Sequence, residues 1–222
     1  MAQQVLPTSA ATGPSNRTTE VYEQLRRAIV EGSIRPNERL IENDLAERFN
    51  VSRTPIRESM MRLAADGLII SQRRGWAVRE HSPTEIREVY EVRAGLEGFA
   101  AGLAAERATD EELKAIQAIH QSYSDSVRES SRGHMVAHND EFHEAVLAAS
   151  HNQLLVERVH ANSQYYFIHR IAGFLSDEEV RNSIEGHGEL VKALVARDPA
   201  LAEKVARANV FEGLVKVLTK IR

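Results

Sequence analysis

The stretch from Pro83 to the end of the chain constrains the fold most, because its apolar residues recur with the period of an α-helix and hardly any run alternates as a strand would. Short polar breaks divide it, and several begin with a capping residue followed by acids, as at a helix N-terminus. The expected helices span about 84–107, 110–129, 134–149, 153–174, 177–196 and 199–220. We therefore predict an antiparallel helical bundle over residues 81–222.

The composition excludes several classes of protein. The 222 residues contain no cysteine, which rules out disulfide scaffolds, thiol nucleophiles and cysteine metal sites and fits a reducing, cytoplasmic setting. No apolar run is long enough to span a membrane, so we expect no membrane partner. Residues 1–16 are small and polar, lack the features of a secretory signal, and are expected to form a disordered tail.

Residues 17–80 have the order of elements found in a winged helix-turn-helix domain. The expected elements are a first helix that begins at Thr18 or Thr19, a second helix over 42–49, a third helix between Ser52 and Gly67, and strands at 68–71 and 76–79. Ser and Thr commonly cap helices, and glycine commonly ends them. The two strands form a hairpin with a basic tip. The fold class is therefore mostly α, with a winged helix-turn-helix followed by the bundle.

The third helix and the hairpin carry the residues that can bind DNA. Arg53 and Arg57 are four residues apart and share one face near the positive end of the helix, where their guanidinium groups suit guanine edges or phosphates. The predicted DNA contacts are Ser52, Arg53, Thr54, Arg57, Arg73, Arg74 and Gly75. The alternative is that these arginines only solvate a small surface. A net charge of +2 over residues 17–80, from twelve Arg, no Lys and ten Asp or Glu, permits either interpretation.

The same region carries a specific motif: LAERFNVSRTPIRE at 45–58, DGL at 66–68 and RGWAV at 74–78. It resembles the GntR family of bacterial transcription regulators, and the helical C-terminal part is similar to the FadR subfamily with its FCD-type effector domain. The resemblance implies DNA contacts at Arg53, Thr54, Arg57 and Gly75. Asn43 stands where the family has a further DNA-contacting arginine, which should weaken or redirect one contact. A homodimer on a palindromic operator is also implied.

The bundle carries polar residues on faces that are otherwise apolar. His143 lies in line with Asn139 and Val146, and His187 lies in line with Val191. A histidine in such a stripe is most often a hydrogen-bonded core residue. Two histidines that converge inside a bundle can instead bind a metal or a ligand.

Arg93 lies in line with Leu96 and Ala100, so we expect its guanidinium inside the bundle, where it needs an anionic partner. That partner is either Glu97 or the carboxylate of an effector. Tyr166 and Arg170 are weaker candidates. The predicted effector-binding residues are Arg93, Asn139, His143, Tyr166, Arg170, His187 and Asn209. The histidines expected at the surface or at helix caps are His120, His134, His138, His151, His160 and His169.

The resemblance also implies a divalent metal, which many FCD domains hold with one Asp and three His. His143 and His187 match two of the three histidines. Asn139 stands where the family has the aspartate, and Asn209 where it has the last histidine. A neutral amide oxygen is a weak ligand, so affinity for Zn²⁺, Ni²⁺ or Mn²⁺ should fall, and a metal-free pocket is the alternative. Asp140 points about 100° away on the helix and is a poor substitute.

The leading hypothesis is a sequence-specific transcription factor, expected to act as a repressor and not as an enzyme. Its helical domain is expected to bind a small metabolite, such as a carboxylic acid, that changes operator binding. One alternative is a metal-dependent enzyme that uses His143 and His187, but it leaves the N-terminal domain unexplained. The other is an effector-independent DNA-binding protein, although polar groups buried without purpose are costly.

Overall fold

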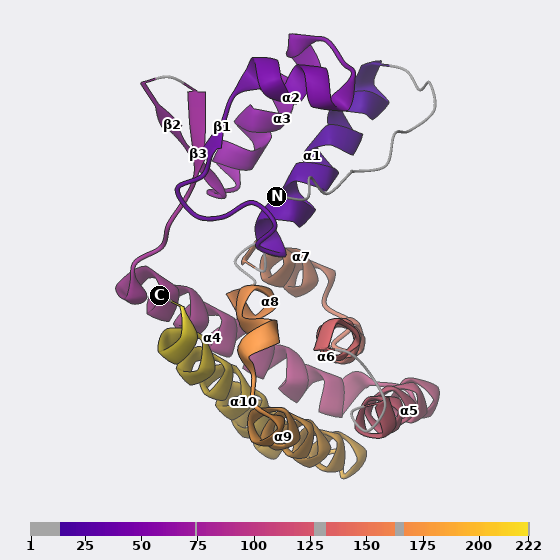
Figure 1. The fold of residues 1–222 in the computed structure, drawn as a ribbon. Helices are drawn as coiled ribbons and strands as arrows, with labels where there is room; N and C mark the ends of the chain where they lie inside the picture. The colour runs from indigo at the N-terminus through magenta and orange to yellow at the C-terminus, as the bar shows by residue number, and fades with distance from the viewer. Residues whose placement is uncertain (1–13, 74, 127–131, 163–166, 222) are drawn as a thin grey trace. The chain divides into compact units, whose positions relative to one another are not determined.

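The computed structural model describes residues 14–73, 75–126, 132–162 and 167–221, and the chain divides into two units, Met1–Glu80 and His81–Arg222 (Figure 1). The predicted mostly α fold is confirmed. Residues 1–13 of the expected tail lie outside the described residues, as do Arg74 and Tyr166. None of the described helices is long and apolar enough to cross a membrane.

The N-terminal unit is the predicted winged helix-turn-helix. Its helices are α1 (Pro14–Val30), α2 (Glu42–Phe49) and α3 (Arg53–Ala65), and its strands are β1 (Arg39–Leu40), β2 (Ile69–Gln72) and β3 (Gly75–Val78). The strands pair antiparallel in the order β1–β3–β2. β1 was not predicted, because two residues are too few to show the alternation of a strand. Between α2 and α3 the chain turns at Asn50, which takes a left-handed conformation with φ 50°.

Helix α1 begins earlier than Thr18 or Thr19, so residues 14–16, which were predicted to belong to the tail, are helical. Proline is tolerated in the first turn because its missing N–H has no intrahelical partner to lose. Thr18 is buried, and its Oγ1 donates a 2.8 Å hydrogen bond to Glu58 Oε2 on α3. The hydroxyl predicted to cap α1 therefore joins α1 to α3.

We define the wing as residues 69–78. The conformation of this hairpin requires a glycine at position 75. Its φ is 99°, and an added Cβ would lie 2.9 Å from the Leu40 backbone oxygen of β1. A side chain there is strained by the backbone and blocked by a backbone atom. We expect Gly75→Ala to destabilise the N-terminal unit by about 1–3 kcal/mol. Urea denaturation followed by the fluorescence of Trp76, the one tryptophan of the sequence, measures the change.

Gly173→Ala is the matched control for this substitution, because no atom lies within 4 Å of the added Cβ and its φ is unexceptional. The control should leave the Trp76 transition where it is. An equally unchanged transition in Gly75→Ala would contradict the role assigned to Gly75.

The C-terminal unit is an all-helical bundle, as predicted. Its elements are α4 (Pro83–Arg107), α5 (Asp110–Ser126), α6 (Arg132–Ala148), α7 (Gln153–Asn162), α8 (Phe167–Ile171), the 3₁₀ turn η2 (Ala172–Phe174), α9 (Asp177–Val195) and α10 (Pro199–Lys220). The prediction of one continuous helix over 153–174 is wrong at its C-terminal end, where residues 172–174 form the 3₁₀ turn η2. The one glycine of this segment, Gly173, lies in that turn, and residues 163–166, between α7 and α8, lie outside the described residues.

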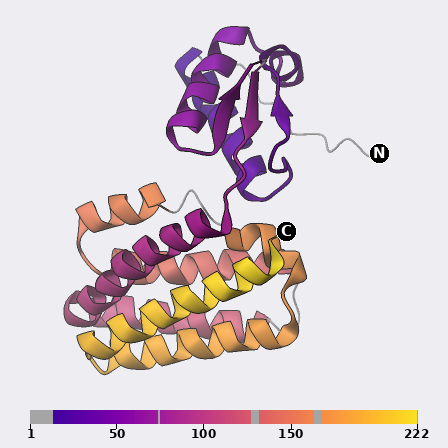
Figure 2. The ribbon, with the colours of Figure 1, turned by 90° about the vertical axis from the view of Figure 1, so that its left-hand side faces the viewer.

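Helices α4 and α10 run antiparallel and pack against each other along their length (Figures 1 and 2). Two glycines of α4 allow this close approach. An added Cβ at Gly98 would lie 2.4 Å from Arg207 Cγ, and one at Gly102 would lie 3.3 Å from the Pro199 backbone oxygen. The bundle core continues from this seam through small and branched side chains, among them Ala101, Ala105, Phe142, Leu190, Leu194 and Ala206.

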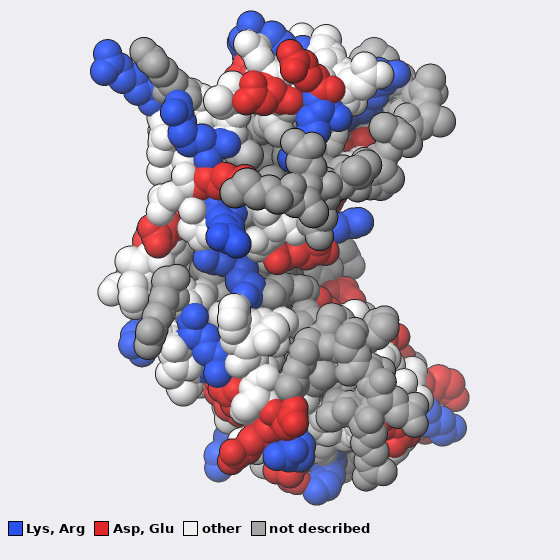
Figure 3. All heavy atoms as spheres, in the orientation of Figure 1, with Lys and Arg blue, Asp and Glu red and all other residues white. Residues whose placement is uncertain are grey.

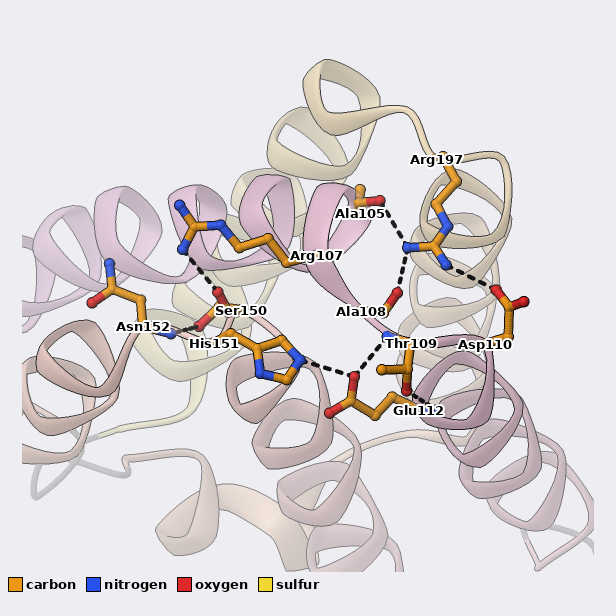
Figure 4. Close-up of polar contacts among 10 residues, drawn as sticks. All are labelled: Ala105, Arg107, Ala108, Thr109, Asp110, Glu112, Ser150, His151, Asn152 and Arg197. Atoms are coloured by element: carbon orange, nitrogen blue, oxygen red, sulfur yellow. Dashed lines mark hydrogen bonds and ion pairs between the residues drawn. The ribbon is translucent and has the colours of Figure 1, made fainter.

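Side chains from helices distant in the sequence hold the corner where α4 turns into α5 (Figure 4). Arg197, which follows α9 with φ 54°, donates through Nη1 to the Ala108 carbonyl, and its Nη2 lies 2.9 Å from Asp110 Oδ1. Arg107 Nη1 donates to the Ser150 carbonyl at 3.2 Å. These carbonyls lie at helix ends, where no intrahelical donor reaches them. The corner thus fixes α4 against the ends of α6 and α9.

Candidate functional site

The N-terminal end of α3 presents two arginines to solvent. The side chains of Arg53 and Arg57 are 61% and 60% exposed, whereas Ile56 between them is buried in the core. Ser52 and Thr54 are exposed as well. Ser52 occupies the predicted N-cap position, although its side chain makes no capping hydrogen bond. The DNA-contact candidates on this helix therefore lie together at one accessible end.

Both guanidinium groups lie beside one carboxylate that the sequence analysis did not single out. Glu42 Oε2 lies 3.6 Å from Arg53 Nη2 and 3.4 Å from Arg57 Nη2. Such solvent-exposed ion pairs contribute little to stability. A carboxylate shared by both arginines nevertheless restricts the directions that they take. The available signal in the sequence was an acid at the first position of the second helix.

The tip of the wing carries a further candidate. Arg73 is exposed in the turn between β2 and β3, whereas Arg74 lies outside the described residues. Figure 3 shows basic side chains, in blue, projecting at the tip of this hairpin. Gly75 lies next to the tip, and its left-handed conformation and closeness to β1 mean that the fold requires this glycine whether or not DNA approaches it.

The C-terminal unit contains a cavity of about 80 Å³ between α4, α5, α6, α9 and α10. Five of the predicted effector-binding residues line it, namely Arg93, Asn139, His143, His187 and Asn209. They come from four different helices, so tertiary packing alone brings them together. Arg170 lies on α8 and is not among the described residues that line the cavity.

The two predicted histidines meet in this cavity. The rings of His143 and His187 lie edge to face with centroids 5.0 Å apart, and His187 stacks on Phe142 at 4.4 Å. His187 is 3% exposed, and burial lowers its pKa well below the usual 6.5. Burial also lowers the pKa of His143, although Glu97, whose Oε2 lies 3.9 Å from His143 Nδ1, opposes the shift. Both imidazoles are therefore neutral near neutral pH.

His120 was expected at the surface or at a helix cap, and this expectation is wrong. Its ring lies 6.2 Å from the Phe142 ring, and its Nδ1 is buried without a hydrogen-bond partner among the described residues. Partial burial lowers the pKa of His120. His120 also faces α9, since an added Cβ at Gly188 would lie 3.2 Å from its Nε2. His120 therefore lies next to Phe142, as His143 and His187 do, and the three histidines form one cluster.

Comparison with known families follows the division into two units. The model of the bacterial regulatory proteins of the gntR family matches residues 17–78, and the FCD domain model matches residues 88–210. The chain belongs to the GntR family. Its FCD domain places it in the FadR-type branch of these bacterial transcriptional regulators. The family assignment does not favour the alternative of a metal-dependent enzyme.

Relatives and solved structures agree with this assignment. The chain is 29% identical over 206 residues to the transcriptional regulator YdhC of Bacillus subtilis, covering 88% of each chain. It is 31% identical to the Nta operon transcriptional regulator of Aminobacter aminovorans, covering 85% of this chain and 88% of the relative. The solved structure of Escherichia coli McbR has the same fold, with a TM-score of 0.79 and 22% identity over 93% of this chain and 99% of that one.

Both cations that line the cavity of this GntR regulator have anionic partners within the protein. Arg93 Nε donates a 2.8 Å hydrogen bond to Glu97 Oε1 on the same helix. Of the two partners expected from the sequence, Glu97 and an effector carboxylate, the structure therefore contains Glu97. Lys216, which the sequence analysis missed, is 6% exposed and lies 2.7 Å from Glu212 Oε1. Its Nζ also donates to Ser183 Oγ at 2.6 Å and to the Glu179 carbonyl at 2.8 Å.

The residues at the metal-ligand positions of the FCD family do not fit the ion that the resemblance implies. Asn209 Nδ2 donates a 3.0 Å hydrogen bond to the Gly186 carbonyl, so only its neutral amide oxygen could act as a ligand. Asn139 supplies a neutral oxygen in place of a carboxylate. Among the described residues, no group of three or more His, Asp or Glu side chains could hold a metal ion. Two imidazoles and two amides form a weak donor set for Zn²⁺ or similar ions.

Glu42→Gln is expected to raise the affinity of this regulator for random-sequence DNA and to lower its discrimination between sequences. The substitution removes a negative charge beside two arginines that are predicted to contact DNA. The slope of log affinity against log salt concentration should therefore steepen by about one unit. Fluorescence anisotropy with labelled duplexes across a salt series measures both effects. Glu31→Gln, an exposed acid after α1, makes the same charge change and should leave the slope as it is. Identical slopes for the two variants would count against the role of Glu42.

Proposed function

We propose that the protein is a metabolite-responsive repressor that binds a palindromic operator as a homodimer, with α3 in the major groove and the wing against the backbone. The observation that carries this proposal is the exposed pair Arg53 and Arg57 at the positive end of α3. Arg73 and the backbone at Gly75 are placed to contact phosphates beside them. A regulator bound across a promoter represses by excluding the polymerase.

Selection of bound duplexes from a random pool tests the proposal directly. A sequence-specific dimer recovers an inverted repeat whose half-sites lie about one helical turn apart. A single unrepeated site would contradict the dimer, and the absence of any preferred duplex would contradict specific DNA binding.

Ligand response requires that the cavity in the C-terminal unit differ between the DNA-competent and DNA-incompetent arrangements. A ligand with equal affinity for both changes nothing. A coupling of about 1–3 kcal/mol is sufficient to change operator binding by one to two orders of magnitude. The polar residues that line the cavity, in place of a dry apolar core, support this role over that of an effector-independent DNA-binding protein.

An apolar face on the outer side of the α4–α10 pair supports the homodimer. Val92 and Phe99 are each 52% exposed on α4, and Phe211 and Val215 are 37% and 61% exposed on α10. These residues flank the seam where the two helices meet. Gly95 lies between the two α4 residues with open space around it, so another backbone can approach closely. We assign this face, the α4–α10 face, to contact with a second copy of the chain.

Phe99→Glu is expected to dissociate the dimer, because it places a charge at the centre of the α4–α10 face. Sedimentation equilibrium measures the mass, and operator affinity should fall at the same time because one protomer binds one half-site. Phe174→Glu is the matched control, since Phe174 is 73% exposed and belongs to η2, not to α4 or α10. A Phe99→Glu protein that remains dimeric would place the interface elsewhere.

A further inference from the structure

Two residues that line the cavity carry a deeply buried polar group that the described residues do not fully satisfy. His187 Nδ1 has no hydrogen-bond partner among them, and Tyr90 Oη, which lies beside the donor Arg93, has no acceptor for its own proton; the two residues are 3% and 1% exposed. Both residues line the same cavity. An unsatisfied buried polar group costs about 1–3 kcal/mol, so such atoms indicate a partner that the chain does not supply.

The charged side chains around these atoms are already paired, so they attract a charged ligand only weakly. Arg93 is paired with Glu97, and the ammonium group of Lys216 has three oxygen partners. The histidines that face the cavity are buried in a manner that disfavours their charged form. A carboxylate entering the cavity would meet cations that Glu97 and Glu212 already neutralise, and it would lose its own hydration.

We infer that this cavity binds an uncharged, hydroxyl-bearing small molecule directly, without a bridging divalent metal. A hydroxyl group both donates and accepts, so it satisfies the Nδ1 atom of a neutral histidine in either tautomer and also the phenol of Tyr90. The apolar side chains of Val180, Leu175 and Val210 complete the wall and suit the carbon skeleton of such a ligand. The inference rests on the proposed ligand response and names the class of ligand.

The amides of Asn139 and Asn209, which stand at two metal-ligand positions of the family, also favour direct binding of an uncharged ligand. With Asn139 and Asn209 in place of an aspartate and a histidine, the ligand positions carry no carboxylate to offset a dication, and the nearby Glu97 and Glu212 are paired with Arg93 and Lys216. Amide groups instead offer one acceptor and two donors each. A cavity of about 80 Å³ has room for roughly five to eight water-sized groups, which suits a short polyol.

Metal content is the first test. Wild-type protein incubated with Zn²⁺, Ni²⁺ or Mn²⁺ and desalted is expected to retain far less than one ion per chain, measured by mass spectrometry of the elements. Asn139→Asp, which is nearly isosteric, and the double variant with Asn209→His should gain metal, the double variant approaching one ion per chain. A wild-type protein that retains one ion per chain would overturn the inference.

Matched pairs of ligands that differ only in a terminal group provide the second test. Glycerol, erythritol and xylitol are each compared with the corresponding carboxylate, glycerate, erythronate and xylonate, at millimolar concentration by calorimetry and thermal shift. At least one polyol should bind more tightly than its carboxylate. Tyr90→Phe, which removes one hydroxyl from the protein, should lower the affinity for that polyol about five- to tenfold. General stabilisation by polyols as cosolvents would persist in this variant.

Tighter binding of the carboxylates, no binding by any polyol, or equal affinity in Tyr90→Phe would each overturn the inference. None of these results would affect the proposed function. That function is tested by duplex selection with ligand-free wild-type protein, where recovery of an unrepeated site would contradict the dimer and recovery of no preferred sequence would contradict specific DNA binding.

Discussion

Replacing both Arg53 and Arg57 with alanine is expected to abolish specific operator binding and to leave the fold intact. Each guanidinium that pairs with a base edge contributes about 1–3 kcal/mol of discrimination, so loss of two lowers affinity by about 30-fold or more per half-site. Their side chains are 61% and 60% exposed, so their removal leaves no buried cavity. Electrophoretic mobility shift with the selected palindrome, at fixed salt, measures the loss.

Arg27→Ala is the control for this double variant, because Arg27 is an exposed arginine on α1 that the sequence and structure both leave outside the DNA surface. Its loss removes a positive charge and should weaken binding to all sequences slightly and evenly. Circular dichroism shows whether each variant is folded. Undiminished operator binding by the double variant would show that another surface binds DNA.

Lowering the pH from about 7.5 to about 5.5 is expected to destabilise the C-terminal unit. Burial holds the pKa of His187 well below 6.5 and lowers that of His143. Below the unfolded value near 6.5, the unfolded chain takes up protons at these residues that the folded chain does not. The free energy of unfolding therefore falls as the pH falls through this window, by up to about 1.4 kcal/mol per pH unit for each histidine, and is flat above it.

The N-terminal unit supplies an internal control for this measurement. The first histidine of the chain is His81, so residues before it carry none, and Trp76 fluorescence reports on that part alone. Far-UV circular dichroism during urea denaturation follows mainly the C-terminal unit, which holds most of the helical residues, and the Trp76 signal identifies the part of the change that comes from the N-terminal unit. His143→Gln should reduce the pH slope, whereas His160→Gln, at an exposed residue paired with Glu144 at 2.8 Å, should not. A C-terminal transition that does not move with pH would contradict the buried, neutral state of the pair.

The patterns that predicted the fold correctly were local. The third helix followed from a capping position, a proline in the first turn and an apolar stripe, all within about three turns of chain. The exposure of Arg53 and Arg57 followed from the same stripe, because Ile56 and Met60 must face the core. Where a local signal was absent, the prediction failed, as at the two-residue strand β1.

The candidate cavity could be predicted only in part. The stripes placed Arg93, His143 and His187 on inward faces, and the structure brings these three together. Lys216 and Tyr90 were missed because each is one polar or amphipathic residue in an otherwise ordinary apolar stripe. Nothing in the sequence indicated that they would face the same cavity.

The sequence by itself determined the class of protein and the exposure of the two arginines at the start of α3, because helix periodicity, capping and residue spacing depend on neighbours along the chain. Tertiary structure alone decided which inward-facing polar groups meet and which are already satisfied. Glu97 holds Arg93, Glu212 holds Lys216, and His187 Nδ1 is left without a partner among the described residues. Periodicity states which face of a helix turns inward, but the packing of five helices determines what that face meets.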